Sequence, residues 1–205
     1  MNDPYRKALF LEYFTVGYNL VEAFVSILFG NMAGSIALVG FGLDSIVESL
    51  SGMVMILRLR QHGRISAERE EKIEKRAQAF VALTFFILAA YVLYESVDKL
   101  LNHEISEPTV AGILIATVSL IVMPVLMVQK FRTGKEINSK ALIADSKETL
   151  ACAFLSGALL VGLGSNLLFG FWQADPIVGL VIVVFLVREG LENWHEAREA
   201  PGSAD

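Results

Sequence analysis

Long apolar segments alternate with short polar ones along the whole chain. Six of them predict helices, at 8–30, 34–58, 74–101, 108–130, 141–164 and 175–195. Each is close to the ~20 residues that an α-helix needs to cross the hydrocarbon core of a bilayer. One connection stands out, the strongly charged LRLRQHGRISAEREEKIEKR between the second and third segments, which we expect to be solvated and partly helical. The pattern predicts an all-α membrane protein, a six-helix transmembrane bundle.

The composition agrees with a single transmembrane domain. Hydrophobic residues make up 54% and charged residues 19% of the 205 positions, and a soluble domain of this size is normally more polar. The polar tail after the last segment is too short to pack alone, so we expect residues 1–205 to form one domain without a separate soluble domain. The net charge of −5 does not indicate nucleic-acid binding, and the lipid bilayer is the expected partner.

Lys and Arg residues are distributed unevenly between the two ends of the predicted helices. If the N-terminus is cytoplasmic, the outer loops contain only Lys99. The cytoplasmic segments then contain Arg6, Lys7, Arg58, Arg60, Arg64, Arg69, Lys72, Lys75, Arg76, Lys130, Arg132, Lys135, Lys140, Arg188 and Arg198. By the positive-inside rule, both termini are predicted to be cytoplasmic, in a multi-pass protein of the plasma or inner membrane.

Two of the apolar segments contain ionisable residues at a spacing of four. Asp44 and Glu48 lie in the second segment, and Glu148 and Cys152 lie in the fifth. A spacing of four places both members of each pair on one face of a helix. Ionisable groups inside a membrane are costly and usually mark an ion pathway. The two pairs therefore predict a protein that handles cations.

The predicted topology places these two pairs at the same depth. At the α-helical rise of 1.5 Å per residue, Asp44 lies roughly 14 Å below the outer end of its helix and Cys152 roughly 16 Å below the outer end of its own. Because the two helices are antiparallel, Glu48 then lies level with Glu148. If the two faces meet, three carboxylates and one thiol form a site that suits a divalent transition metal, and zinc in particular.

Other roles for these residues stay open. Asp44 and Glu48 also fit a packing pair that neighbouring serines satisfy, and Cys152 fits a small apolar side chain. Asp145 shares the face of Glu148, which places it at the entrance of the site or behind its ligands. Lys147 is offset from that face by about 100° and fits a side chain that snorkels to the interface or neutralises a nearby carboxylate.

Polar residues elsewhere in the apolar segments suggest structural roles. Glu22 and Asn19 fit helix–helix hydrogen bonds, with a proton path as the alternative. Asp175 precedes Pro176 and fits the N-cap of the sixth helix. The sequence contains no His-Glu-x-x-His string, and neither a Ser–His pairing nor a Gly-rich phosphate loop is apparent, so we do not expect an enzyme.

The chain resembles the transmembrane domain of the cation diffusion facilitator family. GSIALVGFGLDSIVESLSG is similar to the second-helix signature of that family and SKALIADSKETLACAF to its fifth-helix signature, while YESVDKLL and ADPIVGLVI are similar to its third and sixth helices. Glu48, Glu148 and Cys152 occupy positions where the family usually has Asp or His. We do not expect the cytoplasmic C-terminal domain that many members have, so the resemblance is to a short branch of the family.

The resemblance implies transport of a divalent metal in exchange for protons. The expected function is zinc/proton antiport that exports metal from the cytoplasm, by a homodimer. Manganese, iron, cobalt and cadmium are alternative metals, because the carboxylates favour the harder ions and the thiol the softer ones. The alternative function is that of a metal-binding membrane protein that modulates a partner without transporting.

Overall fold

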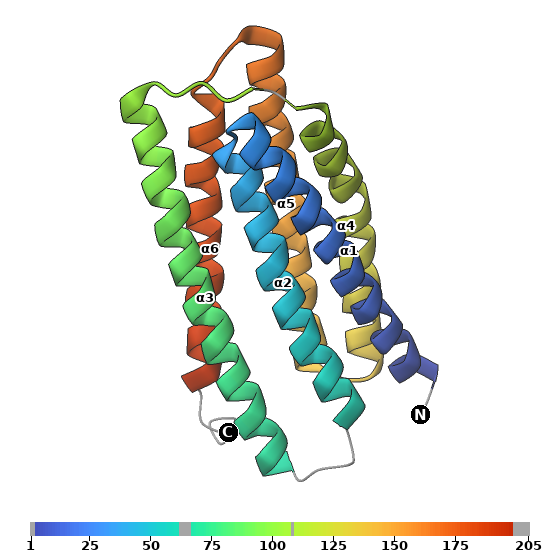
Figure 1. The fold of residues 1–205 in the computed structure, drawn as a ribbon. Coiled ribbons are helices and arrows are strands. Elements are labelled where there is room, and N and C mark those ends of the chain that lie inside the picture. Colours follow the sequence, from blue (N-terminus) through green and yellow to red (C-terminus); the bar gives the residue numbers. More distant parts are fainter. Residues whose placement is uncertain (1–2, 62–66, 108, 199–205) are drawn as a thin grey trace.

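The computed structural model describes residues 3–61, 67–107 and 109–198. These residues form six α-helices without a strand (Figure 1), which confirms the predicted all-α fold. The helices are α1 (Asp3–Ala33), α2 (Ile36–Gln61), α3 (Ala67–Asn102), α4 (Val110–Glu136), α5 (Lys140–Phe169) and α6 (Ala174–Arg198). Helices α1 to α5 each contain a stretch long and apolar enough to cross a membrane. Helix α6 has Asp175 in its first turn and Arg188 and Glu189 in its second half.

The helices pack into a bundle with α2 and α5 between two outer pairs. Helices α3 and α6 pack together on one side, and α1 and α4 lie on the other (Figure 1). Helix α2 packs closely against α1 at two glycines, because glycine has no side chain to keep the two helices apart. A Cβ atom at Gly42 would lie 2.8 Å from Ile27, and one at Gly52 would lie 2.8 Å from Val16. Such small residues let helix backbones approach each other in membrane proteins.

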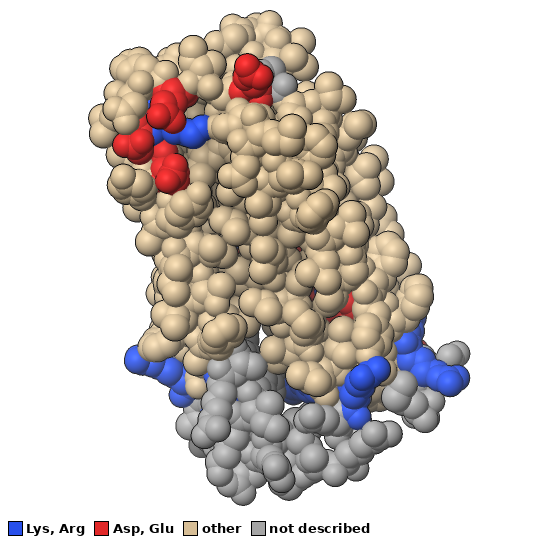
Figure 2. All heavy atoms as spheres, viewed as in Figure 1, with Lys and Arg blue, Asp and Glu red and all other residues tan. Residues whose placement is uncertain are grey.

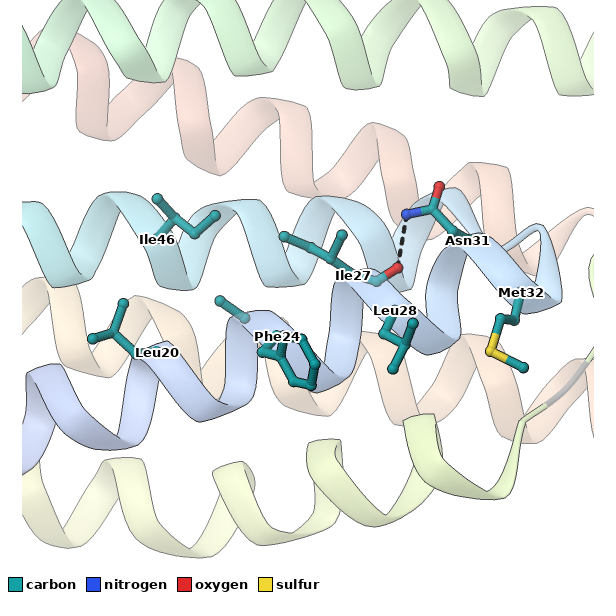
Figure 3. Close-up of a pocket in the computed structure, with 8 residues that line it drawn as sticks. Leu20, Phe24, Ile27, Leu28, Asn31, Met32 and Ile46 are labelled. Atoms are coloured by element: carbon teal, nitrogen blue, oxygen red, sulfur yellow. Dashed lines mark hydrogen bonds between the residues drawn. The ribbon is translucent and has the colours of Figure 1, made fainter.

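Helix α1 buries its polar face and exposes its apolar face, which is the reverse of a helix at the surface of a soluble protein. Five polar side chains at spacings of three and four are fully buried, namely Glu12, Thr15, Asn19, Glu22 and Ser26. The opposite face is apolar and exposed, and part of it forms a groove beside α2 with Leu20, Phe24 and Met32 (Figure 3). A helix in water would bury its apolar face instead. The arrangement therefore suits a lipid environment around the bundle and a polar route inside it.

The two largest differences from the predicted helix boundaries lie at the same end of the bundle. Helix α3 begins at Ala67 rather than at 74, so part of the charged connection is helical, as expected. Helix α4 continues to Glu136 rather than ending at 130, which puts Lys130 inside the bundle. Residues 62–66, including Arg64, lie outside the described residues. Figure 1 shows the start of α1 and the end of α6 at this end of the bundle, and most of the Lys and Arg side chains visible on the face drawn in Figure 2 gather there.

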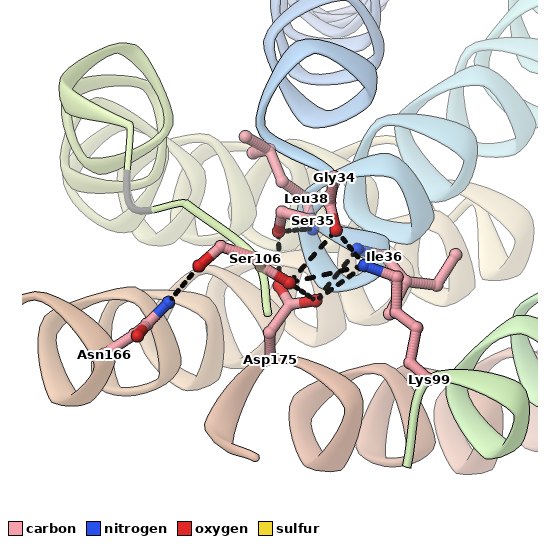
Figure 4. A network of polar contacts seen from close by, with 8 residues as sticks. All are labelled: Gly34, Ser35, Ile36, Leu38, Lys99, Ser106, Asn166 and Asp175. Atoms are coloured by element: carbon pink, nitrogen blue, oxygen red, sulfur yellow. Dashed lines mark hydrogen bonds and ion pairs between the residues drawn. The ribbon is translucent and has the colours of Figure 1, made fainter. Parts of the chain in front are cut away.

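Asp175 organises the opposite end of the bundle (Figure 4). Its carboxylate accepts hydrogen bonds from the Ile36 backbone N–H at 2.9 Å, the Ser106 hydroxyl at 2.9 Å and the Ser35 hydroxyl. The Lys99 ammonium lies 3.9 Å from the same carboxylate. Asp175 lies within the first turn of α6, and the helix whose N-terminus it caps is α2. The prediction that it caps α6 was therefore wrong.

Lys99 and Ser106 extend this network to neighbouring segments. The Lys99 ammonium donates to the Gly34 carbonyl, which is also an alternative acceptor for the Ser106 hydroxyl at 3.0 Å. The Asn166 amide donates to the Ser106 carbonyl at 2.7 Å. The contacts join the α1–α2 turn, the α3–α4 connection and helices α3, α5 and α6. Lys99, the one basic residue predicted for the outer loops, is thus largely buried and links these segments through its hydrogen bonds.

Candidate metal centre

Asp44 and Glu48 lie on the buried face of α2, as their spacing predicts. Their exposed fractions are 8% and 5%. The single proton of the Ser45 hydroxyl is shared between two acceptors, Glu22 at 2.9 Å and the Phe41 carbonyl at 3.0 Å, and Ser49 donates to the Ser45 carbonyl at 2.8 Å. These two serines are therefore engaged elsewhere and do not satisfy the carboxylates. Neither carboxylate oxygen of Glu48 has a hydrogen-bond partner among the described residues.

Glu148 and Cys152 lie on α5 and contact different neighbours. The Cys152 side chain is buried, with 1% exposed, and its Sγ lies 3.9 Å from Oε2 of Glu22 on α1. Glu148 is half-buried and accepts a hydrogen bond at 3.2 Å from the Asn193 amide on α6. Its other oxygen has no partner within the described part of the chain. The site therefore involves α1 and α6 as well as the two predicted helices.

Glu22 connects the two predicted helices at one level of the bundle. Its Oε2 accepts from the Ser45 hydroxyl on α2 at 2.9 Å and lies against Cys152 on α5. Because Ser45 is next to Asp44 in the chain, this contact agrees with the prediction that Asp44 and Cys152 have the same depth. The hydrogen bond to Ser45 also confirms the helix–helix role expected for Glu22. Both polar atoms of the Asn19 amide, in contrast, have no partner among the described residues.

The structure does not gather the four predicted ligands into a finished metal site. Within residues 3–61, 67–107 and 109–198, no group of three or more His, Cys, Asp or Glu side chains is arranged to hold a metal ion. The donor chemistry nevertheless fits a cation, because Glu22, Glu48 and Glu148 each present a buried oxygen without a partner. Buried carboxylates are costly unless paired with a cation, a proton or a donor. The ligand assignment remains a prediction.

A second charged cluster was not predicted. The Lys130 ammonium on α4 lies 2.6 Å from the Asp145 carboxylate on α5 and 3.3 Å from the Glu12 carboxylate on α1. We expected Lys130 in a polar segment at the cytoplasmic end of the fourth helix, and its side chain is instead buried within α4, which continues past it. Its spacing from Ser119, Met123 and Leu126, which all lie on the buried face of α4, was the signal that could have shown its burial.

The remaining residues near the predicted site have distinct positions. Asp145, expected at the entrance, is paired with Lys130. Lys147 is exposed on the outer surface beside Phe131, as its angular offset predicts, and so faces away from the buried carboxylates. Glu189 and Asn193 of α6 were overlooked, although their spacing of four and their burial match the pattern of the predicted pairs.

Comparison with known proteins gives the class to which this bundle belongs. A family model described as the cation efflux transmembrane domain matches residues 13–199. The chain therefore belongs to the cation efflux family, as the resemblance of its helix signatures indicated. It forms the multi-pass transmembrane part that this family model describes.

Three curated relatives illustrate the similarity. The magnetosome protein MamB of Magnetospirillum gryphiswaldense is 30% identical over 169 residues, which cover 80% of this chain and 57% of MamB. The cation-efflux pump FieF of Serratia proteamaculans is 24% identical, over 80% of this chain and 56% of the pump. Transmembrane protein 163 of Xenopus laevis is 22% identical, over 91% of this chain and 66% of that protein. The chain thus spans between about half and two thirds of the length of these relatives.

Proposed function

We propose that this protein transports divalent metal cations across a membrane. The observation that carries the proposal is the set of buried carboxylates on α1, α2 and α5, of which Glu22, Glu48 and Glu148 have oxygens without a hydrogen-bond partner among the described residues. Membership of the cation efflux family supports the same reading. A route for ions through a membrane requires a bundle with a polar interior and an apolar outer surface, and this bundle has both.

The coupled ion in this proposal is the proton. Asp44, Glu48, Glu148 and Cys152 must be deprotonated to bind a metal, so metal loading releases protons and protonation favours metal release. With both termini in the cytoplasm of a plasma or inner membrane, metal would load from the cytoplasm and leave outward as helices rock around the site. Zinc is the first candidate, and manganese, iron, cobalt and cadmium follow from the mixed oxygen and sulfur donors.

Transport by a homodimer is part of the proposal. The exposed apolar faces of the bundle provide area for a second copy, and small residues would allow close helix approach there. Light scattering of the protein in nanodiscs tests this point separately. A single chain per nanodisc at all protein concentrations would refute the dimer and leave the transport proposal standing.

The decisive experiment measures metal uptake by proteoliposomes that contain only this chain. A pH gradient is imposed, and zinc, manganese, iron, cobalt and cadmium are compared with matched liposomes that contain the Asp44→Ala variant. Uptake of at least one metal that depends on the gradient and on Asp44 is expected. Metal binding without uptake of any of these metals would refute transport and favour a metal-binding protein that modulates a partner.

A further inference from the structure

Three charged side chains from three helices meet inside the bundle, next to the predicted metal ligands but not among them. Glu12 and Lys130 are fully buried and Asp145 is 4% exposed. The Lys130 ammonium is 3.3 Å from Glu12 Oε2 and 2.6 Å from Asp145 Oδ2. Glu12 Oε2 would lie 3.4 Å from a Cβ atom at Gly52, so the cluster also lies against α2. Four helices therefore surround one ammonium group.

The cluster has more oxygen atoms and more negative charge than Lys130 balances. Two carboxylates and one ammonium leave one net negative charge when all three groups are ionised. Glu12 Oε1 and Asp145 Oδ1 are buried without a hydrogen-bond partner among the described residues, and so is Thr133 Oγ1, one turn from Lys130 on α4. A buried charge without full compensation is costly, so this arrangement favours either a proton on one carboxylate or a cation of higher charge in place of the ammonium.

The cluster is close to the predicted metal centre and on one side of it. Asp145 is one helical turn from Glu148 on α5, and Gly52 is one turn from Glu48 on α2. Both steps lead toward the end of the bundle where α1 starts, α6 ends and most of the Lys and Arg side chains visible in Figure 2 gather. A cation that enters from that end would meet Glu12 and Asp145 before it reaches Glu48 and Glu148.

We infer that Glu12 and Asp145 form a second cation site, which the Lys130 ammonium fills until a divalent cation displaces it. Two carboxylates balance the charge of one divalent cation, whereas a single ammonium group leaves one negative charge uncompensated. The donors are all oxygen atoms, which suits a hard ion such as Mn²⁺. The binding property stands on this cluster alone, and its place on a transport route rests on the proposed function.

The test removes the built-in cation and counts bound metal. The purified full chain is studied in detergent with the predicted metal centre disabled by Asp44→Ala, and Mn²⁺ binding is measured by equilibrium dialysis and by the loss of the free-ion EPR signal. At Mn²⁺ concentrations too low to displace the Lys130 ammonium, the double variant Asp44→Ala/Lys130→Gln is expected to bind about one Mn²⁺ per chain more than Asp44→Ala alone, because two carboxylates suffice to anchor such an ion. The matched control Asp44→Ala/Lys130→Arg keeps the cation and should bind no additional Mn²⁺ at the same concentrations.

Two further outcomes keep the inference open to refutation. Equal Mn²⁺ binding by the Lys130→Gln and Lys130→Arg double variants would overturn it, whatever the unmodified chain binds or transports. If the Lys130→Gln double variant is not monodisperse in metal-free buffer, added Mn²⁺ should restore a single folded species. Failure of Mn²⁺ to restore it would equally overturn the inference, whereas failure of the proposed function would be seen separately in the liposomes.

Discussion

Asp175 provides the most direct test of how the bundle is held together at the end away from the chain termini. Replacing it by alanine removes the acceptor of the Ile36 N–H and of two serine hydroxyls, and it removes the carboxylate that faces Lys99. Hydrogen bonds to a charged acceptor contribute about 1.5–3 kcal/mol each. Lys99 and Ser106 keep the Gly34 carbonyl as an acceptor, so the losses do not add fully.

The expected cost is therefore that of breaking one buried charged pair, about 3–5 kcal/mol. For a domain of this length, each kcal/mol lowers the unfolding midpoint by about 2–4 °C, so Asp175→Ala should lower it by about 10 °C. Thermal unfolding in mild detergent, followed by the fluorescence of Trp172 and Trp194, measures this shift. Asp175→Asn keeps one acceptor oxygen and should fall between the alanine variant and the unmodified protein.

Asp98→Asn is the matched control for the Asp175 variants. Asp98 lies on the same side of the bundle and accepts a hydrogen bond from Asn102 at 3.0 Å, but this contact is exposed. Its substitution should change the free energy of unfolding by no more than about 0.5 kcal/mol, as is usual for surface positions. Equal midpoint shifts for Asp175→Ala and Asp98→Asn would refute the reasoning that the buried network stabilises this end.

Three other predictions concern the candidate metal centre and the topology. At metal concentrations too low to displace the Lys130 ammonium, Asp44→Ala should abolish binding of zinc, manganese, iron, cobalt and cadmium in calorimetry while the protein remains monodisperse. Undiminished binding would contradict the site assignment, and Glu148→Ala should behave in the same way. Cys152→Ser should weaken cadmium binding far more than manganese binding, because a hydroxyl is a poorer ligand than a thiolate for a soft ion, and a silent substitution across all metals would remove Cys152 from the site. A cysteine introduced at Ala67 should react with a membrane-impermeant reagent only from the cytoplasmic side, so labelling of intact cells from outside would overturn the topology.

The helices were predictable from the sequence because each apolar segment is long and its local composition decides its structure. The burial of Asp44 and Glu48 followed from the same local periodicity. Contacts between distant segments were not predictable in this way. Lys130 pairs with Glu12, which is 118 residues away in the chain, and Asp175 caps α2 through Ile36, which is 139 residues away. No local pattern indicates which distant side chain meets a buried charge, so Lys130 looked like an ordinary basic residue at a helix end.

The buried polar face of α1 has a consequence for how the protein is made. Among the five helices that could span a membrane, α1 has the lowest mean hydropathy, 1.3, against 2.5 for α4. Charged side chains such as those of Glu12 and Glu22 oppose insertion of a single helix into lipid. Helix α2 is synthesised next, and its glycines at 42 and 52 provide the close-fitting surface against which α1 packs. We therefore expect stable insertion of α1 to depend on α2, so that the first two helices enter the membrane as a pair.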